Sequence, residues 1–282
     1  MRAIKVIKNI IKFFLIKIYN FENLEKTKLK SFIILRDILF HPKLLFLRLT
    51  RNTVKFNSIV PNSIFKKIDK NKIKEIKIDS NNFLRDDLIK VGSEILKKYG
   101  LVIIENAFDP KTVDDFVVVS NKYIQNDKLK SKETNKYLNQ NLDKIPLIKD
   151  KFILSDIISK TIDLSCKNDF NKKNEFAYAR QSPIVTKFTP SGENTKSNWS
   201  SGWHVDFPTQ FTATVLLEDL GPNCTRMQAL PCTKFLPLIP GKHYDISPSV
   251  KKKDFENKII DIYGPKGTLY IHDGNTLHRN FP

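Results

Sequence analysis

A histidine and an aspartate stand two residues apart in Trp203-His204-Val205-Asp206, within a stretch of short strand-like runs. On a strand, residues i and i+2 point to the same side, so His204 and Asp206 would present an imidazole and a carboxylate to one cavity. A third ligand from a distant strand would complete a facial triad of two histidines and one carboxylate, which suits Fe(II) and leaves coordination positions open. The sequence therefore predicts a metal site built on β-structure.

A second pair with the same spacing, His243-Tyr244-Asp245, lies in a different context. Its surroundings contain residues that discourage strand pairing, namely Pro237, Pro240, Gly241 and Pro248. We therefore interpret His243 and Asp245 as features of a surface loop.

Two histidines could supply the third ligand, and both lie in the segment 267–282. Asp273-Gly274-Asn275 is typical of a turn, which divides this segment into two strands. His272 ends the first strand, whereas His278 lies inside the second and would be held by neighbours on both sides. This favours His278 as the ligand, and we interpret His272 as a structural residue or as a support for the ligands.

The main part of the chain changes from helices to short strands. Helical spacing and capping signals predict helices over 86–99, 110–125 and 150–165, and an apolar run predicts a strand over 101–105. After residue 175, strand-like runs are separated by Gly, Pro, Asn and Asp. They cover 175–189, 202–207, 211–218, 226–230, 258–263, 267–272 and 276–281. This order predicts an α+β fold, a sandwich or barrel with helices packed outside.

The N-terminal residues 1–75 predict a basic helical extension, joined by a linker over 76–84 to the main domain at 85–282. The extension carries 18 basic and 5 acidic side chains, a net charge of +13. Residues 3–19 are apolar but interrupted by four lysines, which predicts an amphipathic helix and neither a membrane-spanning helix nor a signal peptide. The apolar side of residues 1–50 either packs on the protein itself or contacts an anionic membrane.

Charge and cysteine content narrow the classes of function. Residues 76–282 carry a net charge of only +5, and the basic extension contains no recognisable nucleic-acid-binding module, so a nucleic-acid partner is not expected. Three cysteines without a Cys-x-x-Cys pair predict reduced thiols. We expect a cytoplasmic protein, associated with membrane if residues 1–50 contact lipid.

Four stretches, in this order, resemble the phytanoyl-CoA dioxygenase family of Fe(II)/2-oxoglutarate oxygenases: LKKYGLVIIENAFDPKTVDDF, WHVD, EDLGPNCTRMQALPCTKF and GTLYIHDGNTLHRN. The resemblance implies a double-stranded β-helix, or jelly-roll, over residues 85–282. It implies Fe(II) bound by His204, Asp206 and His278, with 2-oxoglutarate as cosubstrate. The implied reaction is hydroxylation by O2 of a C–H bond in a small-molecule or lipid substrate. Because Asp206 occupies the carboxylate position, hydroxylation is expected rather than halogenation.

The chain departs from the family pattern in two places. The family has Pro-Gly-Ser-His where this chain has Pro231-Cys232-Thr233-Lys234, so cysteine replaces a turn glycine. The family also anchors the far carboxylate of 2-oxoglutarate with an arginine on the strand after the distal histidine, whereas this chain ends at Pro282. We therefore expect a sequence truncated at its C-terminus, without its closing strands.

Other residues are candidates for contacts with the cosubstrate. Arg180 and Lys187 precede the His-x-Asp pair on a strand-like run, where they either contact the acidic cosubstrate or are ordinary solvated charges. Asn280 would share the inward side of its strand with His278, whereas Arg279 would point outward. Trp203 either stacks beside the metal pocket or is a buried structural residue.

Two further functions remain open on the sequence alone. A jelly-roll could serve as a non-catalytic binding module. The absent arginine and the altered turn favour this function, whereas the intact set of His204, Asp206 and His278 argues against it. A membrane-peripheral interaction protein could instead carry its function in residues 1–75.

Overall fold

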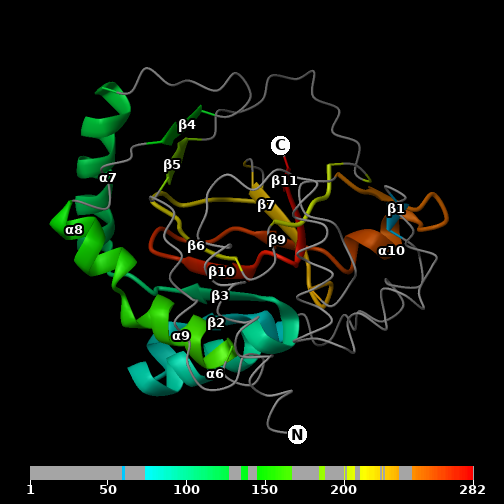
Figure 1. Ribbon diagram of the computed structural model, residues 1–282, viewed down its shortest axis with the longest axis horizontal. Coiled ribbons are helices and arrows are strands. Elements are labelled where there is room, and N and C mark those ends of the chain that lie inside the picture. Colours follow the sequence, from blue (N-terminus) through cyan, green and yellow to red (C-terminus); the bar gives the residue numbers. More distant parts are fainter. Residues whose placement is uncertain are drawn as a thin grey trace, which may run out of the picture. The chain divides into compact units, whose positions relative to one another are not determined.

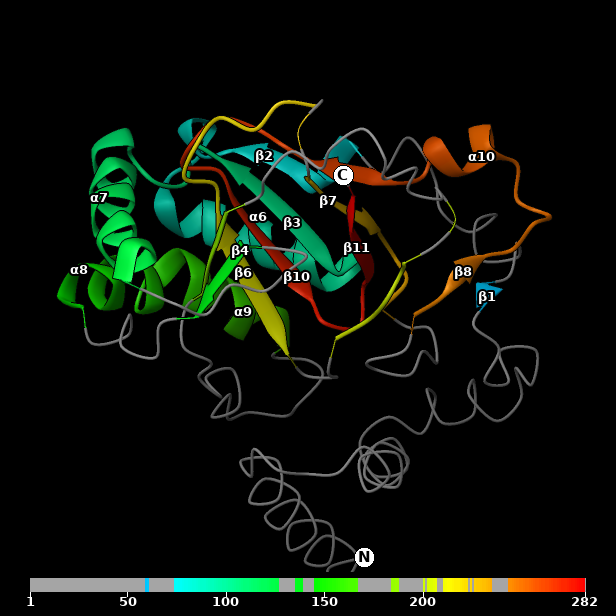
Figure 2. The same ribbon diagram turned by 90° about the horizontal axis from the view of Figure 1, so that it is seen from above.

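The computed structural model describes residues 59–60, 74–126, 135–138, 145–166, 184–187, 200, 202–206, 210–222, 224, 226–234 and 243–281. All of them belong to one compact unit, Phe56–Pro282, which Figures 1 and 2 show in two views. The amphipathic segment predicted within residues 1–50 and the candidate Arg180 lie outside the described residues. In the described part of the chain, no helix combines the length and the apolar character that crossing a membrane requires.

A four-stranded sheet joins strands from both ends of the described chain, in the order β2-β3-β10-β6. Its members are β2 (Lys77–Asp79), β3 (Leu101–Glu105), β10 (Leu269–Asp273) and β6 (Phe211–Val215). β10 is antiparallel to both of its neighbours, and β2 is parallel to β3. In Figure 1 the red β10 accordingly lies next to the teal β3.

One face of this sheet is apolar and is covered by the helices α6 (Arg85–Tyr99) and α9 (Asp156–Cys166) (Figure 1). α6 ends at Gly100, whose φ of 76° gives the left-handed cap conformation that glycine favours. A Cβ built on Gly92 would lie 3.7 Å from Ile104 Cδ1, so α6 packs directly on β3. The apolar face consists of Val102, Ile104, Ala213, Val215, Leu269 and Ile271.

The opposite face of the same sheet carries polar groups. Because side chains alternate along a strand, Tyr270 and His272 of β10 point away from the helices. Their cross-strand neighbours on β6 are Thr214 and Thr212. A buried histidine and a partly buried tyrosine thus lie on the face of the sheet opposite the helices.

A second sheet has three antiparallel strands in the order β11-β7-β9. They are β11 (Leu277–Phe281), β7 (Arg226–Leu230) and β9 (Ile260–Ile262). From one side of this sheet, Met227, Ala229 and Ile262 join the main hydrophobic core. On the other side the guanidinium of Arg279 lies over the ring of Trp203, which in turn contacts Phe255 of the short helix α10 (Lys252–Glu256).

The remaining helices follow the predicted order with one interruption. α7 (Pro110–Asn126) begins after Asp109, whose carboxylate accepts a hydrogen bond from the backbone N–H of Thr112 at 2.9 Å. The single helix predicted over 150–165 is interrupted. Its first residues belong to a π-helical turn η5 (Lys149–Ile153), which follows the short helix α8 (Pro146–Ile148), and α9 begins only at Asp156. Three aromatic rings fill the space between α7 and η5: Phe108, Phe116 and Phe152.

Two predictions for the N-terminal part were wrong where the structure describes it. The stretch 76–84 is not a linker, because it contains β2 and a 3₁₀ turn η3 (Ser80–Asn82), preceded by the 3₁₀ turn η2 (Lys74–Ile76). Within the extension predicted to be helical, β1 (Ile59–Val60) is a strand paired with β8 (Asp245–Ile246). Such short strands have too few residues for a period of two to be visible in the sequence.

The predicted α+β class is confirmed. β3 and β7 have the predicted bounds, and β6, β9, β10 and β11 fall within one residue of the predicted runs or inside them. The run predicted over 175–189 contains β5 (Ile184–Lys187), which pairs antiparallel with β4 (Asn135–Leu138).

Candidate metal centre

The backbones of His204 and His278 face each other as a hydrogen-bonded antiparallel pair. The N–H of His204 donates to the carbonyl of His278 at 2.9 Å, and the N–H of His278 donates to the carbonyl of His204 at 3.0 Å. Directly paired residues project their side chains to the same side of a sheet. The two imidazole rings accordingly have centroids 4.4 Å apart.

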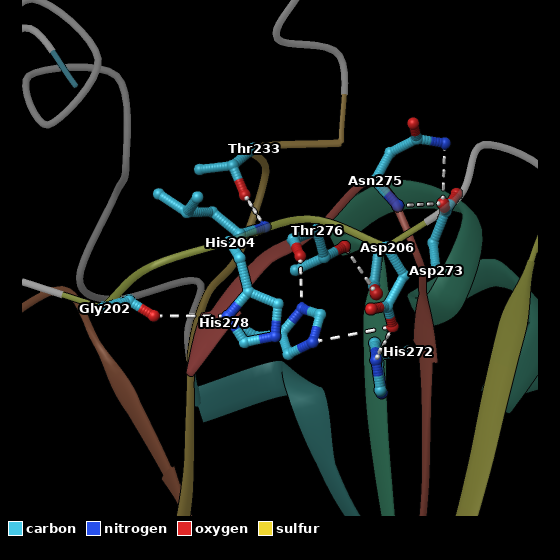
Figure 3. A network of polar contacts seen from close by, with 11 residues as sticks. Gly202, His204, Asp206, Thr233, His272, Asp273, Asn275, Thr276 and His278 are labelled. Carbon is cyan, nitrogen blue, oxygen red and sulfur yellow. Dashed lines mark hydrogen bonds and ion pairs between the residues drawn. The ribbon is translucent and has the colours of Figure 1, made fainter. Parts of the chain in front are cut away.

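Asp206 reaches the same place from the segment that follows His204. Its backbone N–H donates to the carbonyl of Gly274 at 2.7 Å, which ties the segment to the turn between β10 and β11. Its Oδ2 lies 3.6 Å from Nε2 of His278. One ligand atom from each of His204, Asp206 and His278 lies within 4.8 Å of the other two, and Figure 3 shows the three side chains converging.

The tautomers of both paired histidines are set by backbone carbonyls. Nδ1 of His204 lies 3.2 Å from the carbonyl oxygen of Gly202, and Nδ1 of His278 lies 2.8 Å from that of Thr276. A carbonyl only accepts, so each Nδ1 carries the proton and each Nε2 keeps its lone pair. This is the state in which a histidine binds a metal through Nε2.

The charge state of the three residues also suits a cation. Burial lowers the pKa of His204 and, together with the nearby His272, lowers the pKa of His278 to about 3. Burial alone raises the pKa of Asp206, but the interaction with the side chain of His272 and the electrostatic interactions with His278 and His204 outweigh burial and lower it. At neutral pH the site therefore holds two neutral imidazoles and one carboxylate, and no proton has to leave before a metal binds.

The turn that resembles the family's glycine turn supports the strand of His278. Oγ1 of Thr233, which is labelled in Figure 3, accepts a hydrogen bond from the N–H of Leu277 at 2.8 Å. The same oxygen donates to the carbonyl of Leu230 at 2.6 Å. Cys232 has a φ of 63°, so the cysteine occupies a left-handed conformation that glycine adopts at least cost. Cysteine in place of glycine thus leaves the turn intact.

The other candidate residues lie as follows. Trp203 is fully buried on the side opposite His204, against Arg279 and Phe255, which agrees with the alternative that it is a buried structural residue. Successive residues of an extended segment point to opposite sides, and Trp203 therefore belongs to the reverse side of the β11 sheet. Asn280 is exposed on β11, and Lys187 is the last residue of β5; their contacts with a cosubstrate stay predictions.

Two further histidines lie next to the three clustered residues; His243 was not expected there, whereas for His272 a role as a support for the ligands was one of the two interpretations. His243 is exposed, as predicted, but its ring centroid lies 5.6 Å from that of His204, so it borders the site. The residues that follow it form β8 despite the nearby prolines, and Tyr244 pairs with Trp203. His272 is buried, and its Nε2 lies 3.6 Å from Oδ2 of Asp206. In the sequence, only its spacing of two residues from Tyr270 indicates that the two side chains share one face of β10.

The residues present fit a divalent iron ion. Two imidazole nitrogens and one carboxylate from one side of a site form the donor set of non-haem Fe(II) oxygenases, and the far side is left for other ligands. His204 and Asp206 are only partly buried, so small molecules can approach them. The arrangement can hold a metal and admit exchangeable ligands to it.

Comparisons with known proteins give structural neighbours only. No family model and no curated protein matches the chain. Among solved structures it is similar to the epimerase SnoN in complex with Fe3+, alpha ketoglutarate and nogalamycin RO, with a TM-score of 0.46 and 14% identity over 69% of this chain and 77% of that chain. It is similar to EctD from S. alaskensis in its apoform, with a TM-score of 0.40 and 10% identity over 67% and 69%. For AviO1 from Streptomyces viridochromogenes Tue57 the TM-score is 0.41 and the identity 15%, over 68% and 87%.

Proposed function

We propose that this protein is an Fe(II)/2-oxoglutarate-dependent dioxygenase that hydroxylates a C–H bond of a small-molecule or lipid substrate. The observation that carries the proposal is the His204, Asp206 and His278 set, in which both histidines already offer Nε2. The four stretches that resemble the phytanoyl-CoA dioxygenase family supply the choice of 2-oxoglutarate as cosubstrate. On this proposal the four-stranded and three-stranded sheets are the two layers of a double-stranded β-helix.

In this site Fe(II) with 2-oxoglutarate would supply O2 activation coupled to conversion of 2-oxoglutarate into succinate and CO2. His204, Asp206 and His278 hold the ion from one side. The carbonyls of Gly202 and Thr276 keep the imidazoles in the correct tautomer throughout. Because Asp206 occupies the carboxylate position, no position is vacated for a halide, which favours hydroxylation. Lys187, Arg180 and Asn280 are the proposed contacts with the cosubstrate, whereas Trp203 is buried against Arg279 and Phe255.

The experiment is a succinate-release assay on purified protein supplied with Fe(II), 2-oxoglutarate and O2. We expect iron-dependent succinate even without the substrate, at a low uncoupled rate. Asp206→Ala should lower that rate by more than about 100-fold, a greater loss than is typical of residues that only support a ligand. An Asp206→Ala protein with the full rate would contradict the assignment.

The non-catalytic alternative makes a different prediction in the same assay. A binding module of this fold would take up metal and 2-oxoglutarate at His204, Asp206 and His278 but would release no succinate. Equilibrium binding measured beside turnover therefore separates the two functions.

A further inference from the structure

His272 is a buried histidine without a hydrogen-bonding partner in the described structure. Only 3% of its surface is exposed, and neither Nδ1 nor Nε2 has a partner within hydrogen-bond distance. Buried polar nitrogens are nearly always paired in folded proteins, because an unpaired one loses its bonds to water without replacement. A hydrogen-bonding partner within reach of the ring is therefore energetically favoured.

The packing around His272 limits where that partner can be. The ring of Tyr270 is nearly parallel to it, with an interplanar angle of 21° and centroids 6.4 Å apart. On the neighbouring strands, the residues opposite His272 are Leu101 of β3 and Thr212 of β6. Nε2 lies 3.6 Å from Oδ2 of Asp206, and Figure 3 shows the two side chains next to each other. A distance of 3.6 Å is longer than a hydrogen bond, and a side-chain shift of under 1 Å would close it.

His272 differs from the two proposed ligands in one chemical respect. His204 and His278 each commit Nδ1 to a backbone carbonyl, which leaves Nε2 as an acceptor for the ion. His272 has no such carbonyl partner, so its proton is free to reside on Nε2 and to be donated. Among the described residues, the set of ligand atoms within 4.8 Å of one another includes His204, Asp206 and His278 but not His272.

We propose that His272 is a positioning residue, which donates a hydrogen bond from Nε2 to Asp206 and fixes the orientation of that carboxylate for the metal. The inference rests on the proposed metal centre. A carboxylate has enough lone pairs to accept from His272 and to bind an ion at the same time. Without the imidazole, Asp206 would be free to rotate, and the metal would bind a less ordered ligand set.

The test compares metal affinity in His272→Gln, which keeps an N–H donor near the position of Nε2, with affinity in His272→Leu, which has no donor. Metal-free proteins are titrated with Co(II) as a spectroscopic probe for Fe(II), and their thermal unfolding is measured without metal. The matched control is Ile271→Val on the other face of β10. We expect His272→Leu to bind Co(II) about 10- to 100-fold more weakly. His272→Gln and the control should stay within about threefold of the wild type, with unchanged Co(II) spectra.

Each other result has a defined meaning. If His272→Leu binds Co(II) as tightly as the wild type, the residue only packs and the inference is wrong. If His272→Gln is as weak as His272→Leu and its Co(II) spectrum changes, His272 is itself a ligand, which also overturns the inference. If His272→Leu does not fold, His272→Phe, which can stack on Tyr270, takes its place. A wild-type protein that binds no metal would instead refute the proposed function.

Discussion

At the scale of single residues, the burial of His278 links its protonation to stability. Its pKa is lowered to about 3, from 6.5 for an ordinary histidine, first by burial and then by the neighbouring His272. Between pH 6.5 and about 3 the unfolded chain binds a proton that the folded chain does not, so the free energy of unfolding falls as the pH falls through this window. Urea unfolding of the metal-free protein at pH 7.5 and pH 5 should show the loss.

The control for this pH dependence is His278→Gln, which cannot take up the proton. We expect its free energy of unfolding to change less between pH 7.5 and pH 5 than that of the wild type. Equal changes in the two proteins would show that His278 is not the group responsible.

The two His-x-Asp pairs can be separated by single substitutions. His204→Ala removes a proposed ligand, whereas His243→Ala removes an exposed ring 5.6 Å away that is outside the clustered ligand set. Metal titration should show loss of binding in His204→Ala, by more than about 100-fold. His243→Ala should remain within about threefold of the wild type. Loss of affinity in His243→Ala equal to that in His204→Ala would assign a ligand role to the second pair.

The histidines near the site differ in how clearly their positions can be predicted from the sequence. Period-two alternation was sufficient to place His204 and Asp206 together, although His204 lies in an isolated β-bridge rather than a long strand. His278 was preferred over His272 because it lies inside its strand, but both residues lie on strands. What distinguishes them is a carbonyl within reach of Nδ1, and a backbone hydrogen bond of this kind is not visible in a sequence.

At the scale of elements, a polar row on the reverse side of the second sheet holds its strands together. Nε and Nη2 of Arg279 donate to Oε1 of Gln228 at 2.9 and 2.8 Å, and Nε2 of Gln228 donates to Asp261 at 2.7 Å. The guanidinium also lies 4.6 Å from the ring centroid of Trp203. Since Trp203 and Arg279 adjoin His204 and His278 in sequence, this row braces both ligand-bearing segments.

Arg279→Met tests this brace. The methionine keeps the packing on Trp203 but leaves Oε1 of Gln228 without these two donors, so we expect the free energy of unfolding to fall by about 1–3 kcal/mol. Gln228→Met added to Arg279→Met removes the acceptor that was left unpaired. Because it also removes the donor to Asp261, we expect it to recover only part of the loss. Chemical denaturation of the wild type, the single variant and the double variant measures these differences in the free energy of unfolding. An Arg279→Met protein as stable as the wild type would show that the row contributes nothing.

Elements with strong apolar runs were predictable, and short ones were not. β3 and β7 have the predicted bounds because each is a buried run ended by turn residues. β2 and β8 have three and two residues, and they form because a neighbouring strand supplies hydrogen bonds, which no local pattern indicates. No local pattern indicates the π-helical turn η5 either, which interrupts the helix predicted over 150–165.

At the scale of the whole molecule, charge is distributed unevenly along the chain. We propose that the basic N-terminal residues contact an anionic membrane. Residues 1–75 carry a net charge of +13, which should attract anionic lipid and weaken with salt. We expect the full chain to co-sediment with vesicles containing phosphatidylserine at low salt, and a chain beginning at residue 56 to do so far less. Equal sedimentation of both chains would place any lipid contact elsewhere.

Anaerobic titration shows whether His204, Asp206 and His278, which come from two segments distant in sequence, assemble one iron site. Metal-free protein receives Fe(II) and then 2-oxoglutarate while its visible absorption is recorded. We predict one equivalent of bound iron and a charge-transfer band that appears with 2-oxoglutarate in the wild type and is absent in Asp206→Ala. A wild-type protein that binds iron no more tightly than Asp206→Ala, and shows no band, would contradict the account.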